Sequence, residues 1–318
     1  MIAVEHLRKS FGEKVAVADL SFSLQRGQTL ALVGTSGSGK TTTLKMLNRL
    51  IEPSGGKILL DGQDTSQLPL AEMRRKMGYV IQQIGLFPHY TVAENIAIVP
   101  KLLQQNATAT RKRSSELLER LGLPPDQYLH RYPHELSGGQ QQRVGIARAL
   151  AAQPPVLLMD EPFSALDQIT RQELRRDFRE LPELKDTTTI MVTHDLEEAF
   201  ELANLICLLD AGELQQYGSP KALLTNPANP FVSEFLGHQK LQLSMQVLTV
   251  ADLPPKSAKL ENAITNSQKV PQGMRLKEVE SLLLNEAAQA YALTEAGHAY
   301  DLTDINRAAV AFLRQNQK

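Results

Sequence analysis

A glycine-rich loop at residues 34–41 carries the clearest chemical pattern in the sequence. It fits G-x-x-x-x-G-K-[ST] and directly follows the apolar run 28–33, which is typical of a buried strand. Its glycines allow several backbone N–H groups to converge on one phosphate chain, and the helix that follows adds the positive end of its dipole. We expect Lys40 to reach the β- and γ-phosphates and Thr41 to hold Mg²⁺. The alternative, a Gly/Ser surface turn, needs a chance match with a probability of roughly one in a hundred.

Two acids at the end of a second apolar run form the next candidate. Asp160 and Glu161 directly follow residues 156–159, which are typical of a buried strand. The carboxyl ends of parallel strands form the edge at which α/β proteins bind ligands. We expect Asp160 to hold Mg²⁺, largely through the water shell of the ion, and Glu161 to accept a proton from an attacking water. A strand-end acid pair without function is the alternative, and the phosphate loop upstream weighs against it.

Another Gly-containing turn, at residues 136–141, opens a predicted helix. Taken alone, this pattern indicates equally a helix cap made by Ser137 and an anion-binding helix start. It is the second candidate for an anion-binding helix start in this chain, after the one that follows residues 34–41. Two phosphate-binding helix ends on one nucleotide require either two lobes or two chains.

The elements that position these residues alternate between strand and helix. The first part mixes β structure with one helix that begins at Lys40 and a helical region from about 91 to 121. Beyond the helix stop at 122–125, strands are separated by helices, which predicts an α/β fold with a mostly parallel sheet covered on both faces. The expected helices are 138–152, 168–181 and 195–203, and the expected strands are 2–7, 22–24, 57–60, 78–81, 156–159, 188–192 and 205–209.

The composition changes towards the C-terminus. A helix capped by Ser219 is broken at 226–230, and a last amphipathic piece ends near Gly237. Residues 238–273 are polar and weakly periodic, which predicts a linker. From Arg275 the pattern indicates a small α+β unit that needs to pack on something else for stability. Its expected elements are a helix at 276–284, a strand at 289–293, a turn at 295–297, a strand at 298–302 and a helix at 304–314.

Bulk properties exclude several classes of protein. The 318 residues are 42% hydrophobic with a net charge of −1, so we expect a globular chain that does not bind nucleic acid. The basic run 111–113 is expected to be a solvated helix face. The single cysteine, Cys207, cannot form an internal disulfide, which fits a reducing compartment. Because no apolar run approaches the ~20 residues of a membrane span and no signal peptide is visible, we expect a cytoplasmic chain that can dock on a membrane protein.

Taken together, these motifs resemble those of the ATP-binding subunit of ATP-binding cassette (ABC) transporters. The resemblance covers residues 1–237, which would form the ABC ATPase domain with a helical subdomain at about 85–152. Residues 34–41 match the Walker A loop, 156–161 the Walker B strand and 136–140 the family signature. The signature match is far more specific than a phosphate loop alone.

The resemblance assigns ATP and Mg²⁺ to residues in this sequence. ATP would contact Gly34, Ser36, Gly37, Ser38, Gly39, Lys40, Thr41 and Thr42, and Mg²⁺ would be held by Thr41, Gln82 and Asp160. Phe11 matches the aromatic residue that stacks on adenine; without the family it would be taken for a core aromatic. Glu161, Gln82 and His194 would be catalytic, with His194 touching the γ-phosphate; a lone histidine at a strand end is otherwise more often structural.

In this family two copies pack head to tail, which implies a homodimer. Each ATP would lie between the Walker A loop of one copy and Ser137, Gly138, Gly139 and Gln140 of the other, with Asp167 communicating across the dimer. Since the chain shows no membrane span, the resemblance implies separate permease subunits. The chain would sit peripherally on the cytoplasmic face of the membrane, and an extracytoplasmic solute-binding protein would act with it indirectly.

Residues 78–89 resemble importers of quaternary ammonium osmoprotectants such as glycine betaine, choline and carnitine, and residues 41–50 and 193–199 agree with that group. An amino acid, phosphonate or metal chelate is the alternative cargo. A non-transport ABC ATPase acting on DNA or the ribosome is less favoured, because neither a long coiled coil nor a second cassette is present. A nucleotide switch without hydrolysis is weaker still, because Glu161 and His194 are in place.

The unit at 274–318 resembles the second half of a cystathionine β-synthase (CBS) module, a regulatory domain that normally comes as paired repeats. In its Thr-x-x-Asp ribose pattern Asp304 fits the acid, while Asp301 occupies the threonine position. A packing or dimerisation appendage is the alternative.

Overall fold

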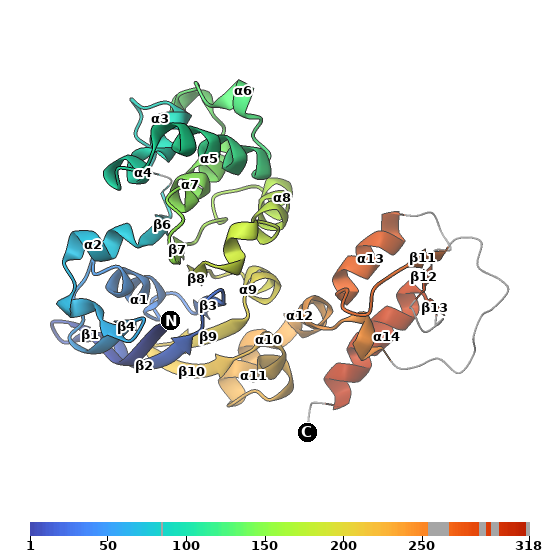
Figure 1. The fold of residues 1–318 in the computed structure, drawn as a ribbon. Helices are drawn as coiled ribbons and strands as arrows, with labels where there is room; N and C mark the ends of the chain where they lie inside the picture. Colours follow the sequence, from blue (N-terminus) through green and yellow to red (C-terminus); the bar gives the residue numbers. More distant parts are fainter. Residues whose placement is uncertain (84, 254–266, 286–290, 294–298, 316–318) are drawn as a thin grey trace. The chain divides into compact units, whose positions relative to one another are not determined.

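The computed structural model describes residues 1–83, 85–253, 267–285, 291–293 and 299–315. The chain divides into two compact units, Met1–Tyr217 and Gly218–Lys318. The first unit contains a large sheet with helices, and the second contains a smaller group of helices and short strands (Figure 1).

The first unit is built on a ten-stranded sheet, counted over the described residues, with the order β5-β4-β1-β2-β10-β9-β3-β8-β7-β6. The strands are β1 (Ile2–Phe11), β2 (Lys14–Leu24), β3 (Thr29–Gly34), β4 (Gly55–Leu60), β5 (Gln63–Asp64), β6 (Met77–Val80), β7 (Val156–Asp160), β8 (Thr188–Val192), β9 (Leu205–Asp210) and β10 (Glu213–Gly218).

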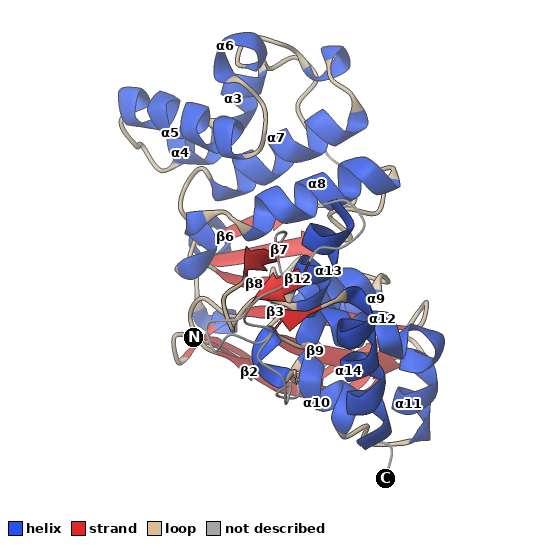
Figure 2. Cartoon of the chain, turned by 90° about the vertical axis from the view of Figure 1, so that its right-hand side faces the viewer, coloured by secondary structure: helices blue, strands red, loops and turns tan. Residues whose placement is uncertain are grey.

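The parallel part of this sheet carries the candidate site. Strand β3 pairs in parallel with β8 and β9, and β7 pairs in parallel with β6 and β8. These strands lie side by side in Figure 2. Every residue of β3, β7 and β8 is buried, as expected for strands covered on both faces. The predicted α/β fold with a parallel core is therefore confirmed.

The antiparallel part is more extensive than the sequence pattern predicted. Strand β1 pairs with β2 and β4, and β4 pairs with β5. Only 22–24 was predicted for the strand that begins at Lys14, because register shifts between Val4 and Ser10 interrupt the alternation of buried and exposed residues. The short strands β5 and β10 were not predicted.

Helices flank the sheet and gather beyond β6, where α3 to α7 form a separate layer (Figure 1). The predicted helical region 91–121 is three helices, because Thr91 caps the first and Asn106 caps the third.

No helix among the described residues has the length and apolar composition that a membrane crossing requires. The helices are α1 (Lys40–Leu47), α2 (Leu70–Arg75), α3 (Val92–Ile96), α4 (Ile98–Leu102), α5 (Ala107–Arg120), α6 (Pro125–Tyr128), α7 (Gly138–Leu150), α8 (Gln168–Arg179) and α9 (Leu196–Leu202).

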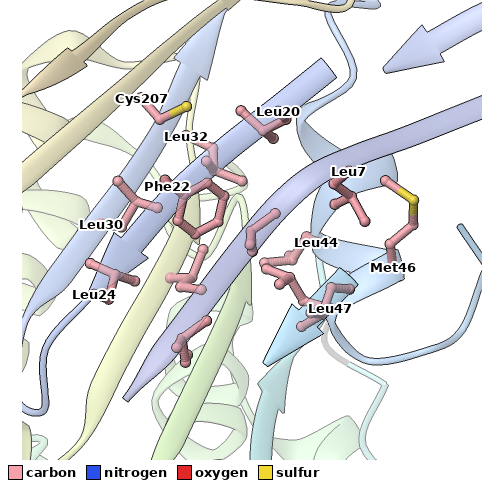
Figure 3. Packing of buried hydrophobic residues seen from close by; sticks show 14 of the residues in the cluster. Leu7, Leu20, Phe22, Leu24, Leu30, Leu32, Leu44, Met46, Leu47 and Cys207 are labelled. Carbon is pink, nitrogen blue, oxygen red and sulfur yellow. The ribbon is translucent and has the colours of Figure 1, made fainter. Parts of the chain in front are cut away.

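An apolar core anchors the helix that follows the phosphate loop. Side chains from β1, β2 and β3 pack with three residues of α1, as Figure 3 shows. The α1 residues are Leu44, Met46 and Leu47, and Leu32 of β3 is fully buried in the same cluster. Both ends of the phosphate loop are therefore fixed to one core.

The second unit has three N-terminal helices followed by a smaller α+β group. The order helix, strand, strand, helix expected from Arg275 is present, while the expected turn at 295–297 lies outside the described residues. A three-stranded sheet has the order β11-β12-β13. The elements are α10 (Pro220–Thr225), α11 (Pro230–Leu236), α12 (Lys240–Val247), β11 (Ser267–Lys269), α13 (Leu276–Asn285), β12 (Tyr291–Leu293), β13 (Ala299–Tyr300) and α14 (Leu302–Gln315).

The division between the units differs from the boundary at 237 that the sequence indicated. Helix α12 lies inside the expected linker 238–273, and its Met245 packs in a cluster with Leu248 and with Val279 of α13 and Ile305 of α14. These apolar contacts make α12 part of the C-terminal unit. They could not be foreseen from the weak periodicity of the segment.

The core around β3 should determine the stability of the first unit. Replacing Leu32 by Ala is expected to lower the free energy of unfolding by about 2–5 kcal/mol, because it leaves a cavity in a packed interior. Urea unfolding followed by circular dichroism measures the change. The control Val15→Ala removes an apolar group that is 53% exposed and should stay within about 0.5 kcal/mol of wild type. Equal losses in the two variants would contradict this packing.

Candidate nucleotide site

The phosphate loop passes so close to neighbouring backbone that two of its positions accept only glycine. A Cβ added at Gly34 would lie 1.8 Å from the carbonyl oxygen of Leu209, and one added at Gly39 would lie 2.4 Å from that of Ala16. Both residues also have positive φ angles, 144° and 98°. The loop is thus wedged between the end of β9 and the start of β2.

A cavity of about 510 Å³ opens over this loop. It brings together residues that are far apart in sequence, because Phe11, Glu161 and His194 join the loop in lining it. Lys14 and Ala16 also line it and were not predicted; they begin β2, directly after the turn that follows Phe11. The lining residues are Phe11, Lys14, Ala16, Gly34, Ser36, Gly37, Ser38, Gly39, Lys40, Thr41, Thr42, Glu161 and His194.

Lys40 is buried under the loop with its ammonium already held in place. Its Nζ donates to the carbonyl oxygens of Gly34 at 3.0 Å and Thr35 at 2.7 Å, and to Ser38 Oγ at 3.3 Å. Burial lowers the pKa of Lys40, and the nearby Glu161 carboxylate partly opposes this effect. An anion in the cavity would therefore stabilise a cation that the protein has partly desolvated.

Asp160 and Thr41 meet beside Lys40. Thr41 Oγ1 donates to Asp160 Oδ1 at 3.1 Å, and the aspartate is only 5% exposed. Burial raises the pKa of Asp160, while the Thr41 hydrogen bond acts in the opposite direction. A carboxylate and a hydroxyl are hard oxygen donors, and a divalent cation would offset the burial of this charge. The pair is thus chemically suited to Mg²⁺.

Two of the predicted catalytic residues, Gln82 and His194, converge on the carboxylate of the third, Glu161. Glu161 Oε2 accepts from Gln82 Nε2 at 3.3 Å and lies 3.4 Å from His194 Nδ1. Glu161 has φ +46°, a region that costs a non-glycine residue of the order of 1 kcal/mol or more. Its backbone N–H donates to Val192 O at 3.0 Å, which fixes this turn against the end of β8.

Phe11 is 50% exposed at this cavity, so it is not the core aromatic that its sequence context alone favoured. Lys9 Nζ lies 5.0 Å from the centroid of the ring, a cation–π distance. The ring is therefore held at the surface, where a flat ligand can reach it.

The segment around His194 rests on a buried acid that the sequence analysis did not identify. Thr193 Oγ1 donates to Glu198 Oε2 at 2.6 Å and accepts from Asp195 N at 3.0 Å. Burial raises the pKa of Glu198 to about 7, helped by Asp195 and opposed by the Thr193 hydrogen bond and by Arg175 and Arg171. In the sequence Glu198 is one of three glutamates on a short predicted helix, and no local pattern marks it as the buried one.

The remaining predicted site residues do not reach the cavity. Ser137 caps α7 by accepting from Gln140 N at 3.3 Å, and Gln140 Oε1 accepts from Ser137 N at 3.0 Å. Asp167 caps α8 in the same way through Thr170 N at 3.1 Å. Ser137 and Gly138 are exposed, and neither these residues nor Gly139 and Asp167 line the cavity. Within one chain, the two groups of predicted residues stay apart.

Comparison with known proteins identifies relatives over most of the chain. A family model described as "ABC transporter" matches residues 17–164. The glycine betaine/carnitine/choline transport ATP-binding protein OpuCA of Bacillus subtilis is 47% identical over 286 residues, 89% of this chain and 75% of that protein. The glycine betaine uptake system ATP-binding protein YehX of Escherichia coli is 51% identical over 253 residues, 79% of this chain and 82% of that protein.

The fold also matches a solved structure. The dimeric structure of MJ0796, a bacterial ABC transporter cassette, superposes with a TM-score of 0.63 at 33% identity and covers 69% of this chain and 98% of the cassette. Taken with the sheet order and the sequence relatives, this similarity confirms the fold that the motifs predicted.

The buried Glu198 predicts a pH dependence of stability. Because its folded pKa of about 7 lies above the ordinary value of 4.5, its contribution to stability is complete below about pH 4.5 and is lost as the pH rises through 7. Glu198→Gln removes this titration. Between pH 5 and 8 wild type should therefore lose up to about 3 kcal/mol relative to the variant. Urea unfolding at several pH values measures this difference.

The matched control is Glu72→Gln, which changes an exposed carboxylate in the same unit. Its stability should run parallel to wild type across the same pH range. Parallel curves for Glu198→Gln as well would contradict the assignment of a buried, titrating acid.

Proposed function

The chain belongs to the ATP-binding proteins of ABC transporters, and from this premise we propose that it hydrolyses ATP to drive uptake of a quaternary ammonium osmoprotectant. Glycine betaine, choline and carnitine are the candidate cargoes. The solute would cross the membrane through a separate permease. The observation that carries the ATPase proposal is the convergence of Gln82 and His194 on Glu161 at the edge of the phosphate cavity.

In the proposed reaction the triphosphate lies along residues 34–42, and the adenine stacks on Phe11. Lys40 balances the charge of the β- and γ-phosphates, since it is the buried cation of the cavity. Glu161 takes the proton of the attacking water at its carboxylate, while Gln82 and His194 orient that carboxylate and the water. The main contributions would be charge neutralisation and alignment, which dominate phosphoryl transfer.

Magnesium fits the polar residues beside the loop. Thr41, Asp160 and Gln82 would hold the ion together with phosphate oxygens and water. When bound, Mg²⁺ neutralises negative charge on the phosphates. The bound cation would also pair with the buried Asp160 carboxylate and so offset the free-energy cost of its burial.

A complete site is proposed to need two copies of the chain. The exposed helix start at Ser137, Gly138, Gly139 and Gln140 would close over the ATP of a second copy, with Asp167 in the same interface. The exposure of Ser137, Gly138 and Asp167 supports this arrangement, as does the absence of all five residues from the cavity lining of their own chain. The solved MJ0796 cassette, which is 33% identical to this chain, is a dimer, and this also supports the proposed two-copy site.

The permease is proposed to dock on the segment that follows Gln82. Phe87 and Tyr90 are 51% and 46% exposed, and their rings are 5.6 Å apart. Buried Asn95 holds this segment: its Oδ1 accepts from Phe87 N at 2.8 Å, and its Nδ2 donates to the carbonyls of Phe87, Tyr90 and Thr91. Such a rigid apolar pair suits a protein partner better than water.

The cargo proposal rests on the relatives and on residues 78–89, of which residue 84 lies outside the described structure. We place the chain peripherally on the cytoplasmic face of the membrane, where ATP is available. A solute-binding protein on the opposite side would deliver the cargo. An amino acid or phosphonate remains the alternative cargo.

Glu161→Gln tests the assignment of the base. The amide cannot take up the proton of water, so steady-state hydrolysis should fall by about 10²–10⁴-fold while ATP affinity is kept. A coupled-enzyme assay gives the rate, and gel filtration with ATP should show the variant accumulating as a dimer. Glu72→Gln, at an exposed position, should hydrolyse ATP like wild type. Normal hydrolysis by Glu161→Gln would refute the role of this residue.

Uptake in cells tests the cargo. A strain lacking this gene should lose uptake of labelled glycine betaine, choline or carnitine after a rise in external osmolarity. The wild-type gene should restore uptake, whereas the Glu161→Gln gene should not. Unchanged uptake of all three, with loss of amino acid or phosphonate uptake, would overturn the proposed cargo and favour the alternative.

A further inference from the structure

We propose that Arg171 is a positioning residue for His194, and that helix α8 thereby links the residues facing the second copy to the catalytic segment of the same chain. This inference rests on the proposed function and adds to it a residue that touches neither ATP nor the reacting atoms. It is drawn from the contacts of two neighbouring residues of α8, Thr170 and Arg171.

Arg171 joins two segments with one guanidinium group. Its Nη2 donates to the carbonyl oxygens of Leu166 at 2.9 Å and Ser164 at 3.4 Å. Its Nη1 lies 3.8 Å from Asp195 Oδ2. The fork of donors on an arginine allows both interactions at once, which a lysine cannot reproduce. Residues 164–166 lead into Asp167, whereas Asp195 directly follows His194.

Asp195 connects Arg171 to the segment that contains His194 through its own hydrogen bonds. Its Oδ1 accepts from the backbone N–H groups of Glu197 at 2.8 Å and Glu198 at 3.3 Å, which caps α9. Its own N–H donates to Thr193 Oγ1, and Thr193 is bound in turn to buried Glu198. His194 is therefore flanked on both sides by residues with fixed hydrogen bonds. A movement of Asp195 would shift the imidazole relative to Glu161.

The first turn of α8 touches the helix start that carries the family signature. A Cβ added at Gly139 would lie 2.8 Å from Thr170 Cγ2, so the two helices are in direct contact here. Thr170 is also the residue whose N–H is capped by Asp167. Helix α8 thus contacts the signature through Thr170. Through Arg171 it contacts both the segment 164–166 and Asp195, which follows His194.

The arrangement gives α8 a defined role in a dimer with two sites. Contact of a second copy with the signature and Asp167 would act on the first turn of α8, and Arg171 would transfer the displacement to Asp195 and His194. Closure at one site would then raise the rate of hydrolysis at the other without being required for it. The coupling passes through hydrogen bonds and an ion pair that substitutions can remove one at a time.

A double-mutant cycle on the full chain tests the inference. Asp195→Asn keeps an oxygen that caps α9 but removes the charge that faces both Arg171 and Arg175. We expect Arg171→Gln and Asp195→Asn each to lower kcat about tenfold while KM for ATP stays within about twofold, because the phosphate loop is untouched. The double variant should be no slower than Asp195→Asn alone, since Arg171 acts on His194 through the Asp195 carboxylate.

Arg176→Gln is the matched control, because it removes the same charge from α8 at a position that is 64% exposed. Its kcat should equal that of wild type. If Arg171→Gln does not fold, Arg171→Lys replaces it in the cycle. Additive losses, an unchanged kcat or a change confined to KM would overturn the inference. An equal rate for wild type and Glu161→Gln would instead overturn the proposed function, so the two failures are distinguishable.

Discussion

Leu32 of β3 and Asp160 of β7 both lie opposite Val192 of β8, and this register brings the carboxyl ends of three parallel strands to one level. The proposed phosphate loop, Asp160, Glu161 and His194 depend on that alignment for their positions. The phosphate loop leaves β3, Asp160 and Glu161 leave β7, and Thr193 and His194 leave β8. A shift of one residue between these strands would turn each side chain to the other face of the sheet. The fully buried apolar residues of the strands make such a shift costly.

The polar groups at this edge are held by partners before any ligand arrives. Lys40 has three acceptors, Asp160 has a hydroxyl donor, and Glu161 has an amide donor and an imidazole neighbour. Burying a charged group costs free energy unless the group is paired. These contacts offset part of that cost in the empty site, and a bound ligand of opposite charge would offset more of it. The same reasoning applies to the layer beneath, where Glu198, Arg175 and Asp195 support His194 without facing the cavity.

Much of the first unit could be predicted because its strands are short apolar runs and its chemical residues follow them directly. The strand Thr188–Val192 was predicted with its exact bounds, and the phosphate loop was found from spacing alone. Residues that enter the site from distant hairpins were missed, as for Lys14, because no local pattern marks a cavity wall. Bulges hid most of β2, and tertiary contacts rather than periodicity made α12 part of the second unit. The helix α8 was predicted, but the use of its Arg171 depends on contacts 24 residues away in sequence.

The central claim is that a working site is assembled from two copies of this chain. Mixing two inactive variants tests it most directly. Lys40→Ala removes the cation proposed to bind the phosphates, and Gly138→Asp places a carboxylate at the exposed helix start, where a Cβ meets nothing within 4 Å. Each variant alone should be inactive in an ATPase assay. Mixed dimers contain one site with both defects and one with neither, so the account predicts that hydrolysis returns on mixing. A mixture as inactive as its components, although mixed dimers form, would contradict it.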